Sequence, residues 1–199
     1  MFGVSSAITI EDTQVNAALA RVEAAGGDTL ALMQEISGAM LFSVQRRFET
    51  QTDPTGRPWK PHAPRTARAR INRKRRGNQE VTPKLLRDSN RLYQSIVAEA
   101  SEMEAATGTN LIYAGIHQHG GSITQYPQSR KVRFRKVGNQ FRFARKAHKR
   151  VSERPVTYGQ RTIVIPARSY LGFSEEDRAE ILAIADAHFE AAAERGEPS

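Results

Sequence analysis

Charge is distributed along this chain in blocks, and this distribution limits the fold more than any other feature. Residues 57–91 hold 12 Lys and Arg against 2 acidic residues, and residues 130–161 hold 12 against 1. These segments contribute +10 and +11 to a whole-chain charge of +9, which leaves −12 on the rest. Like charges do not pack together without counter-charge or solvent. We therefore expect two basic extensions on an acidic framework, with a polyanion or an acidic protein surface as partner.

The length suits one well-packed domain. A chain of 199 residues with 39% hydrophobic residues can bury a single core and still leave part of itself outside. We predict a single domain over 1–199, with a basic extended loop or arm at 52–82 and a basic hairpin extension at 128–161. No cysteine is present, so disulfides and thiolate chemistry are excluded. The apolar pattern predicts neither a signal peptide nor a membrane contact.

Apolar periodicity predicts helices at both ends of the chain. A strand at 6–10 should precede a helix that begins at Asp12 or Thr13 and ends near Ala25. A second helix should follow Asp28, which can cap its N-terminus. Its apolar stripe has helical spacing and comprises Met33, Ile36, Met40, Val44 and Phe48. A last helix should begin after Ser174, with acidic residues in its first turn.

Short alternating segments predict antiparallel strands between these helices. Residues 95–109 should form one hairpin, and residues 130–146 a second with phenylalanines on one face and cations on the other. Residues 161–165 should be a buried strand, ended by Pro166. A short helix should begin at Asn110 and end at Gly120–Gly121.

The remaining basic stretch, 60–83, lacks apolar periodicity and is predicted to be a mobile loop or arm. The fold class is therefore α+β: two N-terminal helices and a C-terminal helix packed on a small antiparallel sheet, with long basic loop and hairpin extensions.

The sequence shows no arrangement that indicates catalysis. It has no P-loop, dinucleotide fingerprint or G-x-S-x-G motif, so no enzyme, catalytic residue or cofactor is expected. His117 and His119 could both reach one metal ion, but no cysteine or nearby acidic cluster supplies further ligands. A metal-dependent hydrolase is the weakest alternative, and no metal site is predicted.

Nucleic-acid binding is a stronger alternative. Basic residues interleaved with aromatic ones suit a strand ribbon lying on phosphates, without a motif that reads bases. The same basic tracts fit an acidic protein surface equally well. The candidate polyanion-binding residues are Arg68, Arg70, Arg73, Lys74, Arg75, Arg76, Arg133, Arg135, Arg142 and Arg145.

Four segments, taken in order, carry a resemblance to a known family. They read RRFETQTDPTGRPWKP, LLRDSNRLYQSI, GTNLIYAGIHQHGG and IPARSYLGFSEED. In this order and spacing the chain resembles the phage virion morphogenesis family, the tail completion proteins of Mu-like tailed bacteriophages. The resemblance implies a structural, non-enzymatic protein of the virion neck, assembled in the host cytoplasm. It implies a homo-oligomeric ring, with a hexamer expected, that contacts the tail tube and the head–tail connector and, as a further expectation, DNA in the channel.

Trp59, the single tryptophan, lies in a Pro/Gly turn where two uses are open. It could fold back as a lid on the helix stripe near Val44 and Phe48, or it could anchor on a neighbouring subunit. The interface candidates follow from the second use and from the motifs around it. They are Phe48, Asp53, Pro54, Gly56, Trp59, Arg168 and Tyr170.

Overall fold

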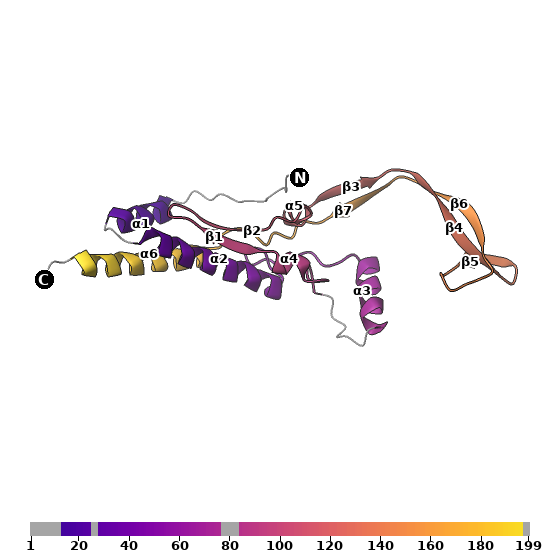
Figure 1. Ribbon diagram of the computed structural model, residues 1–199, viewed down its shortest axis with the longest axis horizontal. Helices are drawn as coiled ribbons and strands as arrows, with labels where there is room; N and C mark the ends of the chain where they lie inside the picture. The colour runs from indigo at the N-terminus through magenta and orange to yellow at the C-terminus, as the bar shows by residue number, and fades with distance from the viewer. Residues whose placement is uncertain (1–12, 25–27, 77–83, 197–199) are drawn as a thin grey trace. The chain divides into compact units, whose positions relative to one another are not determined.

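The computed structural model describes residues 13–24, 28–76 and 84–196. It separates into two compact units. The first, which we call the body, comprises residues 1–120 and 166–199; the second, the β-arm, is Gly121–Ile165. Helices and antiparallel strands are both present, so the predicted α+β class is confirmed (Figure 1).

Three helices build most of the body: α1 (Thr13–Ala24), α2 (Thr29–Thr50) and α6 (Glu175–Gly196). The predicted caps are confirmed at both long helices. Asp28 Oδ1 accepts a hydrogen bond from Ala31 N at 3.0 Å, and Ser174 Oγ accepts one from Asp177 N at 3.1 Å. The strand predicted at 6–10 lies outside the described residues.

Short elements connect these helices. α4 (Arg91–Gln94) leads into the predicted hairpin of β1 (Val97–Ala100) and β2 (Ala105–Gly108), and this hairpin packs against α2. α5 (Ala114–His119) begins later than predicted, with Tyr113 rather than Asn110 at its N-cap. Its end at Gly120, where φ is +72°, agrees with the prediction.

The α2 stripe passes through two hydrophobic clusters. Toward the N-terminal half, Met33 and Ile36 pack with residues of α1 and α6. Toward the C-terminal half, Val44 and Phe48 pack with Trp59 and residues that follow the β-arm. One helix therefore connects both cores, which explains why its stripe runs unbroken for so many turns.

The basic stretch 60–83 was predicted to be a mobile loop or arm; the structure describes it up to residue 76 and finds a helix in most of that part, while residues 77–83 lie outside the described residues. Residues Pro64–Arg76 form a helix, α3. Alanine, arginine and lysine favour helix strongly, and proline is well tolerated in the first turn. The prediction failed because the helix has no apolar stripe, and periodicity was the signal used to find helices.

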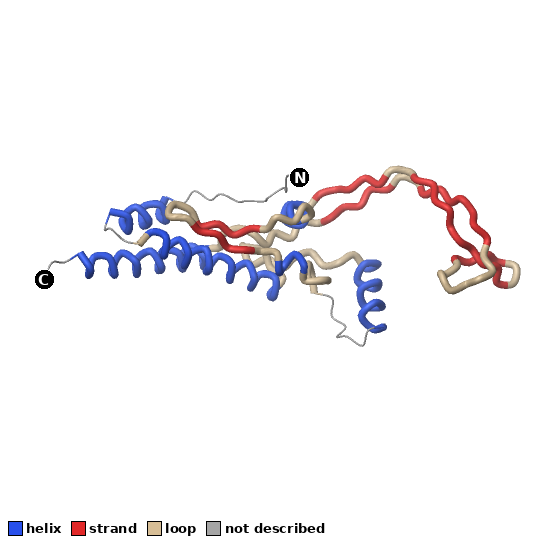
Figure 2. Tube along the Cα trace, in the orientation of Figure 1, coloured by secondary structure: helices blue, strands red, loops and turns tan. Residues whose placement is uncertain are grey.

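The β-arm consists of two consecutive antiparallel ladders. β3 (Gly121–Gln125) pairs with β7 (Arg161–Ile165), and β4 (Gln128–Val137) pairs with β6 (Ser152–Tyr158). The last pair of the first ladder is Gln125↔Arg161, and the first pair of the second ladder is Gln128↔Tyr158. These pairs are three residues apart on each side of the ribbon, so the pairing register is the same before and after the break. Pro127, which has no N–H to donate, lies at this break. Figure 2 shows the two ladders in red with loop between them.

A third strand completes the ladder farther along the chain. β5 (Gln140–Phe143) pairs with β4 through a turn at Gly138, where φ is +61°, and this confirms the predicted second hairpin. The strands β3 and β6 were not predicted. Pro155 lies in β6, which is an edge strand of the order β5-β4-β6, where proline is tolerated.

The strand at 161–165 exists, but the prediction that it is buried was wrong. Val164 is 75% exposed and Ile163 is 38% exposed. A short run of β-branched residues resembles a buried strand in sequence, although here it forms half of a two-stranded ribbon. Among the described residues, no helix has the length and apolar character required to cross a membrane.

Candidate functional site

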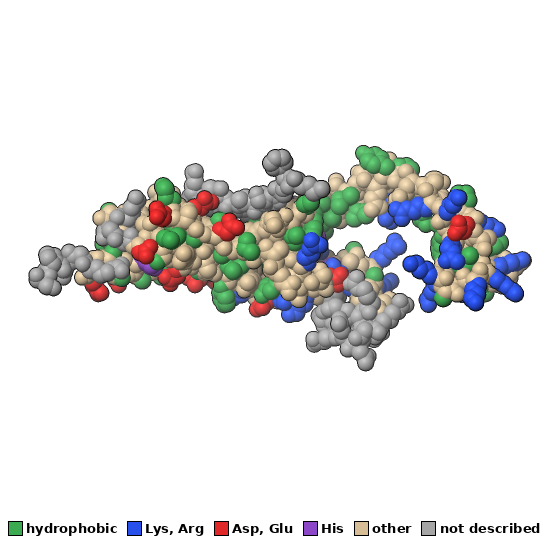
Figure 3. Space-filling view, viewed as in Figure 1, with side chains coloured by type: hydrophobic (Ala, Val, Ile, Leu, Met, Phe, Trp, Pro, Cys, Tyr) green, Lys and Arg blue, Asp and Glu red, His purple; other side chains and the backbone are tan. Residues whose placement is uncertain are grey.

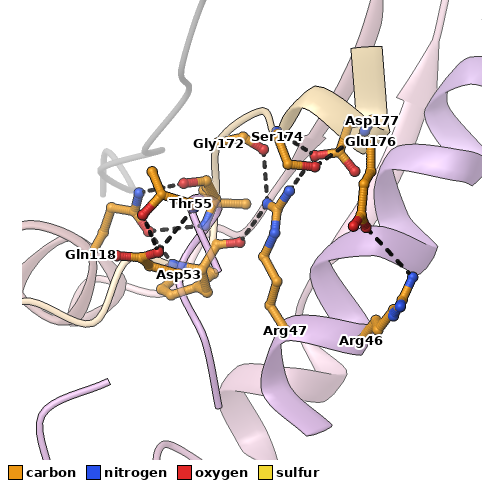
Figure 4. A network of polar contacts seen from close by, with 11 residues as sticks. Arg46, Arg47, Asp53, Thr55, Gln118, Gly172, Ser174, Glu176 and Asp177 are labelled. Atoms are coloured by element: carbon orange, nitrogen blue, oxygen red, sulfur yellow. Dashed lines mark hydrogen bonds and ion pairs between the residues drawn. The ribbon is translucent and has the colours of Figure 1, made fainter. Parts of the chain in front are cut away.

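The motif segments of the sequence converge at one junction in the body. It is formed by the end of α2, the turn at 51–59, helix α5 and the loop 166–174 that leads into α6. The side chains that join them are mostly polar, and Figure 4 shows them together.

Trp59 acts as a lid on the core. Its ring is 5% exposed, meets Phe48 edge-to-face at 5.5 Å between centroids, and donates from Nε1 to the backbone oxygen of Ser169 at 2.9 Å. Its backbone N–H donates to Gln51 O at 2.8 Å, which fixes the turn against the end of α2. The structure therefore favours the first of the two uses for Trp59, because little of the ring is left for a neighbouring subunit.

Arg47 is the cation at the centre of the junction. Its Nη1 donates to the backbone oxygens of Tyr170 at 3.2 Å and Gly172 at 2.8 Å, and its Nη2 donates to Asp177 Oδ2. Asp177 also accepts from Ser174 N at 2.7 Å. Arg47 therefore joins α2 to the loop before α6 and to the first turn of α6.

The ionisation of this pair is set by its surroundings. Burial alone would raise the pKa of Asp177, but hydrogen bonds from Ser43 and Ser174 and the charge of Arg47 together hold this pKa below its usual value. Burial lowers the pKa of Arg47, and Asp177 opposes that change. Both groups stay charged near neutral pH, as a structural ion pair requires.

The turn after α2 is organised by Asp53. Its Oδ1 accepts from Thr55 N at 2.9 Å, Thr55 Oγ1 at 2.7 Å and Arg57 N at 2.9 Å. Slight burial would raise the pKa of Asp53, but these hydrogen bonds and the charge of Arg57 lower it. Gly56, at φ +78°, lets the chain reverse.

Pro54 in this turn docks closely on Gly172. A Cβ placed on Gly172 would lie 2.7 Å from Pro54 Cγ, and the φ of Gly172 is +143°. Only glycine satisfies both constraints. The turn and the loop before α6 are thus fitted to each other.

Gln118 was not selected from the sequence, yet it organises the same loop. Its Oε1 accepts from Tyr170 N at 2.9 Å and from Leu171 N at 3.0 Å, while its Nε2 donates to Leu171 O at 2.7 Å. A glutamine between two histidines gives no periodic signal. The signal that could have identified Gln118 is its position in the HQH motif, where the two histidines were considered as metal ligands and the glutamine was not.

Cationic groups also gather beside the junction. Arg168 Nε donates to Lys60 O at 2.8 Å, and Arg70 Nη1 donates to His62 Nε2 at 3.0 Å. Burial, followed by the charges of Arg168 and Arg70, lowers the pKa of His117; burial and Arg70 do the same for His62. Both shifts favour the neutral form of the imidazole.

The predicted interface residues separate into two groups. Phe48, Tyr170, Trp59 and Arg168 are buried inside the chain. Burial raises the pKa of Tyr170 to about 12, and its hydroxyl donates to Ala114 O at 3.4 Å. Asp53, Pro54 and Gly56 instead line a surface groove of about 610 Å³, together with Phe42 and the start of α6.

The predicted polyanion-binding residues lie in separate elements. Arg68 is exposed on α3, and Arg70 is engaged with His62. Residues 73–76 lie in α3, but their side chains are outside the described part of the structure. Arg133, Arg135 and Arg142 lie on β4 and β5, and Arg145 follows β5.

Register divides the β-arm into two chemically different faces. Phe134 pairs with Phe143 and Lys136 with Phe141, so three phenylalanines share one face, with Phe134 and Phe143 stacked at 5.2 Å. We call this the aromatic face. The opposite, cationic face carries Lys131, Arg133, Arg135 and Arg142. Figure 3 shows Lys and Arg gathered over β4 and β6.

The residues described here contain no group of three or more metal-ligating side chains that could hold an ion. His117 Nδ1 is buried without a hydrogen-bond partner, and the charged groups that act on the pKa of His117 are Arg168 and Arg70. The described residues therefore add nothing in favour of a metal-dependent hydrolase at His117.

Comparison with known proteins decides the family. The model of the phage virion morphogenesis family matches residues 10–190. The chain belongs to this family. It is also 30% identical over 170 residues to the Mu-like prophage FluMu G protein 2 of Haemophilus influenzae, a match that covers 85% of this chain and 84% of that protein. No solved structure matches.

The family match includes both units. The span 10–190 runs from the start of α1 into α6 and encloses the junction, α3 and the β-arm. This phage protein therefore has a role in building the virion, and the resemblance inferred from the four motifs is confirmed.

Proposed function

We propose that this chain is a structural subunit of the phage neck that forms a ring and joins the finished tail to the head-side connector. A hexamer is the expected ring, and the tail tube and connector proteins are the expected neighbours. The family and the Mu-like prophage relative support a role in virion assembly. The polar groups of the junction form hydrogen bonds with one another. This arrangement suits a protein that acts by binding its neighbours rather than by catalysis.

One observation carries the proposal. Every residue of the β-arm is described, and none of its side chains is fully buried. Two- and three-stranded sheets without a hydrophobic core are marginally stable in water. A segment of this size that has no core of its own is suited to being covered by other proteins of an assembly.

Loss of the protein in the phage tests the proposal. Cells infected with a phage that carries an early stop codon in this gene should accumulate filled heads and finished tails as separate particles. Addition of the purified protein to the lysate should restore joined, infectious particles, and addition of a heat-denatured sample should not. Intact infectious virions without the protein would refute the proposal, as would its absence from purified virions.

Non-specific nucleic-acid binding remains a second candidate because of the cationic face. Lys131, Arg133, Arg135 and Arg142 project from one side of the β-arm, as a phosphate-binding ribbon requires. Duplex binding by the purified chain should then weaken steeply as salt rises, and Arg142→Gln should reduce the slope by about one counterion. A flat salt response would remove this candidate and leave the ring proposal unchanged.

A further inference from the structure

The groove beside the turn at 52–56 has an acidic rim. Its lining includes five acidic side chains and two arginines. Arg47 and Asp177 neutralise each other below the surface, with side chains 7% and 9% exposed. The charge left for a partner therefore comes mainly from Asp53 and from Glu175, Glu176 and Glu180 at the start of α6, opposed by Arg46. We call this the acidic groove.

The ion pairs at this rim leave the charge accessible. Glu176 is 3.8 Å from Arg46, with side chains 84% and 65% exposed, and Glu175 is 3.2 Å from Arg178. Exposed pairs of this kind contribute little stability and exchange readily with another cation. Phe42, 64% exposed, adds an apolar patch to the same groove.

The aromatic face of the β-arm is complementary to the acidic groove in charge and in apolar character. Phe141 is 47% exposed and Phe143 is 68% exposed. Lys136 lies opposite Phe141 in the register, and the Arg154 guanidinium lies 3.8 Å from the Phe141 ring centroid. Rings surrounded by cations form the type of surface enriched at the centres of protein interfaces.

We propose that the aromatic face of one subunit docks into the acidic groove of the next copy of the same chain. The inference rests on the proposed ring and specifies its contact. A basic, aromatic surface meets an acidic groove with an exposed phenylalanine, so charge and apolar character match together. The cationic face then points away from this contact and remains available for another partner.

This contact is heterologous, because each subunit offers two different surfaces. Such contacts repeat from copy to copy and close into a ring when the rotation between copies fits a whole turn. The arrangement also accounts for an arm without a core, since the missing cover is supplied by the neighbouring copy.

Charge reversal on the two surfaces provides the test. The groove variant carries Glu176→Lys and Glu180→Lys, and the arm variant carries Lys136→Glu and Arg154→Glu; all four side chains are exposed. The matched control carries Lys131→Glu and Arg142→Glu, the same charge change on the opposite face of the same sheet. Circular dichroism and thermal unfolding should show the same folded body in each variant.

Sedimentation velocity of the full-length protein then measures assembly. The wild-type chain should form closed oligomers, and the groove and arm variants should each self-associate about tenfold or more weakly because like charges meet. An equimolar mixture of the two should recover assembly, because each arm then faces a groove of opposite sign. The control should assemble like the wild type.

Three results would refute the proposed docking of the aromatic face into the acidic groove and leave the proposed neck function standing. They are wild-type assembly by the groove variant, no recovery in the mixture, or a defect in the control equal to that of the arm variant. A wild-type chain that remained monomeric at every concentration would overturn the ring itself, and the docking with it.

Discussion

The body and the β-arm use the same types of residue for opposite purposes. Phe48 in the body is fully buried and contacts Trp59, Tyr93 and Tyr170, whereas Phe143 in the β-arm is 68% exposed and stacks on Phe134 alone among the described rings. Burial of apolar surface stabilises the first unit. The second unit is held by its backbone ladders, ring contacts and side-chain hydrogen bonds such as that between Ser129 and Thr157, and none of its residues is fully buried, so its apolar surface remains available for a partner.

The arginines show the same difference. Arg47 and Arg168 in the body are each 6% exposed and bonded to backbone oxygens, so they hold segments of the chain together. Arg142 and Arg154 in the β-arm are exposed on opposite faces. The basic residues of this chain therefore fall into two groups, buried and exposed. Only the exposed group can contact a polyanion or an acidic protein.

Equivalent truncations of the two phenylalanines should give the largest difference in stability. Phe48→Ala should lower the free energy of unfolding of the body by about 3–5 kcal/mol, because it opens a cavity under Trp59 and Tyr170. Phe143→Ala should lower it by no more than about 0.5 kcal/mol. Chemical denaturation followed by Trp59 fluorescence measures both. Similar losses would remove the distinction between core and exposed rings.

A second comparison uses adjacent arginines of α2. Arg47→Ala leaves Asp177 buried without its cation and should cost about 3–5 kcal/mol of stability. Arg46→Ala removes only an exposed contact with Glu176 and should stay within about 0.5 kcal/mol of the wild type. Thermal unfolding of both variants checks this. An equal shift in both melting temperatures would show that burial of the Arg47–Asp177 pair is unimportant.

Gly172→Ala should give an intermediate effect. The added Cβ would overlap Pro54 and would sit at a φ that non-glycine residues rarely adopt, so a loss of about 1–3 kcal/mol is expected. Gly159→Ala in the β-arm is the matched control, because nothing lies within 4 Å of its added Cβ. If Gly172→Ala left the free energy of unfolding in denaturant unchanged, the close contact between the turn at 51–59 and the loop 166–174 would not contribute to stability.

Acidification should produce the smallest effect, through two histidines of the body. The pKa values of His62 and His117 lie below the ordinary 6.5, so the unfolded chain binds protons that the folded chain does not. Stability is therefore complete above pH 6.5 and falls as pH drops through that value toward the folded pKa. Asp88 opposes the effect at His62. Melting temperatures from pH 7.5 to 5.5 should fall less in His117→Gln than in the wild type. An unchanged slope would refute the assignment.

Much of the body could be predicted from its sequence because local signals and tertiary packing agree there. Asp28 and Ser174 cap the helices that they were predicted to cap. Met33, Ile36, Val44 and Phe48 of the α2 stripe are buried as their spacing indicated, and Met40 is partly buried. Trp59 was predicted to have one of two roles, but sequence alone could not choose between them. The choice depended on Ser169, which lies far away along the chain.

Prediction from sequence failed where the chain has no buried apolar stripe. Helix α3 has good helix formers but no apolar face, so periodicity did not detect it. In the β-arm the β4–β5 hairpin and the strand at 161–165 were predicted, but β3 and β6 were not, because β6 contains Pro155 and β3 contains a glycine and polar residues. Gln118 was missed because its three hydrogen bonds go to backbone atoms more than 50 residues away.

Hydrogen exchange, measured on the free chain and on purified virions, tests the central claim most directly. In the free chain, amides of α2 and α6 should exchange slowly, while those of residues 121–165 should exchange through low-energy opening. In the virion, residues 121–165 should become protected and the body should change little. Strong protection of the β-arm in the free chain, or its rapid exchange in the virion, would contradict the claim that this unit is completed by neighbouring proteins.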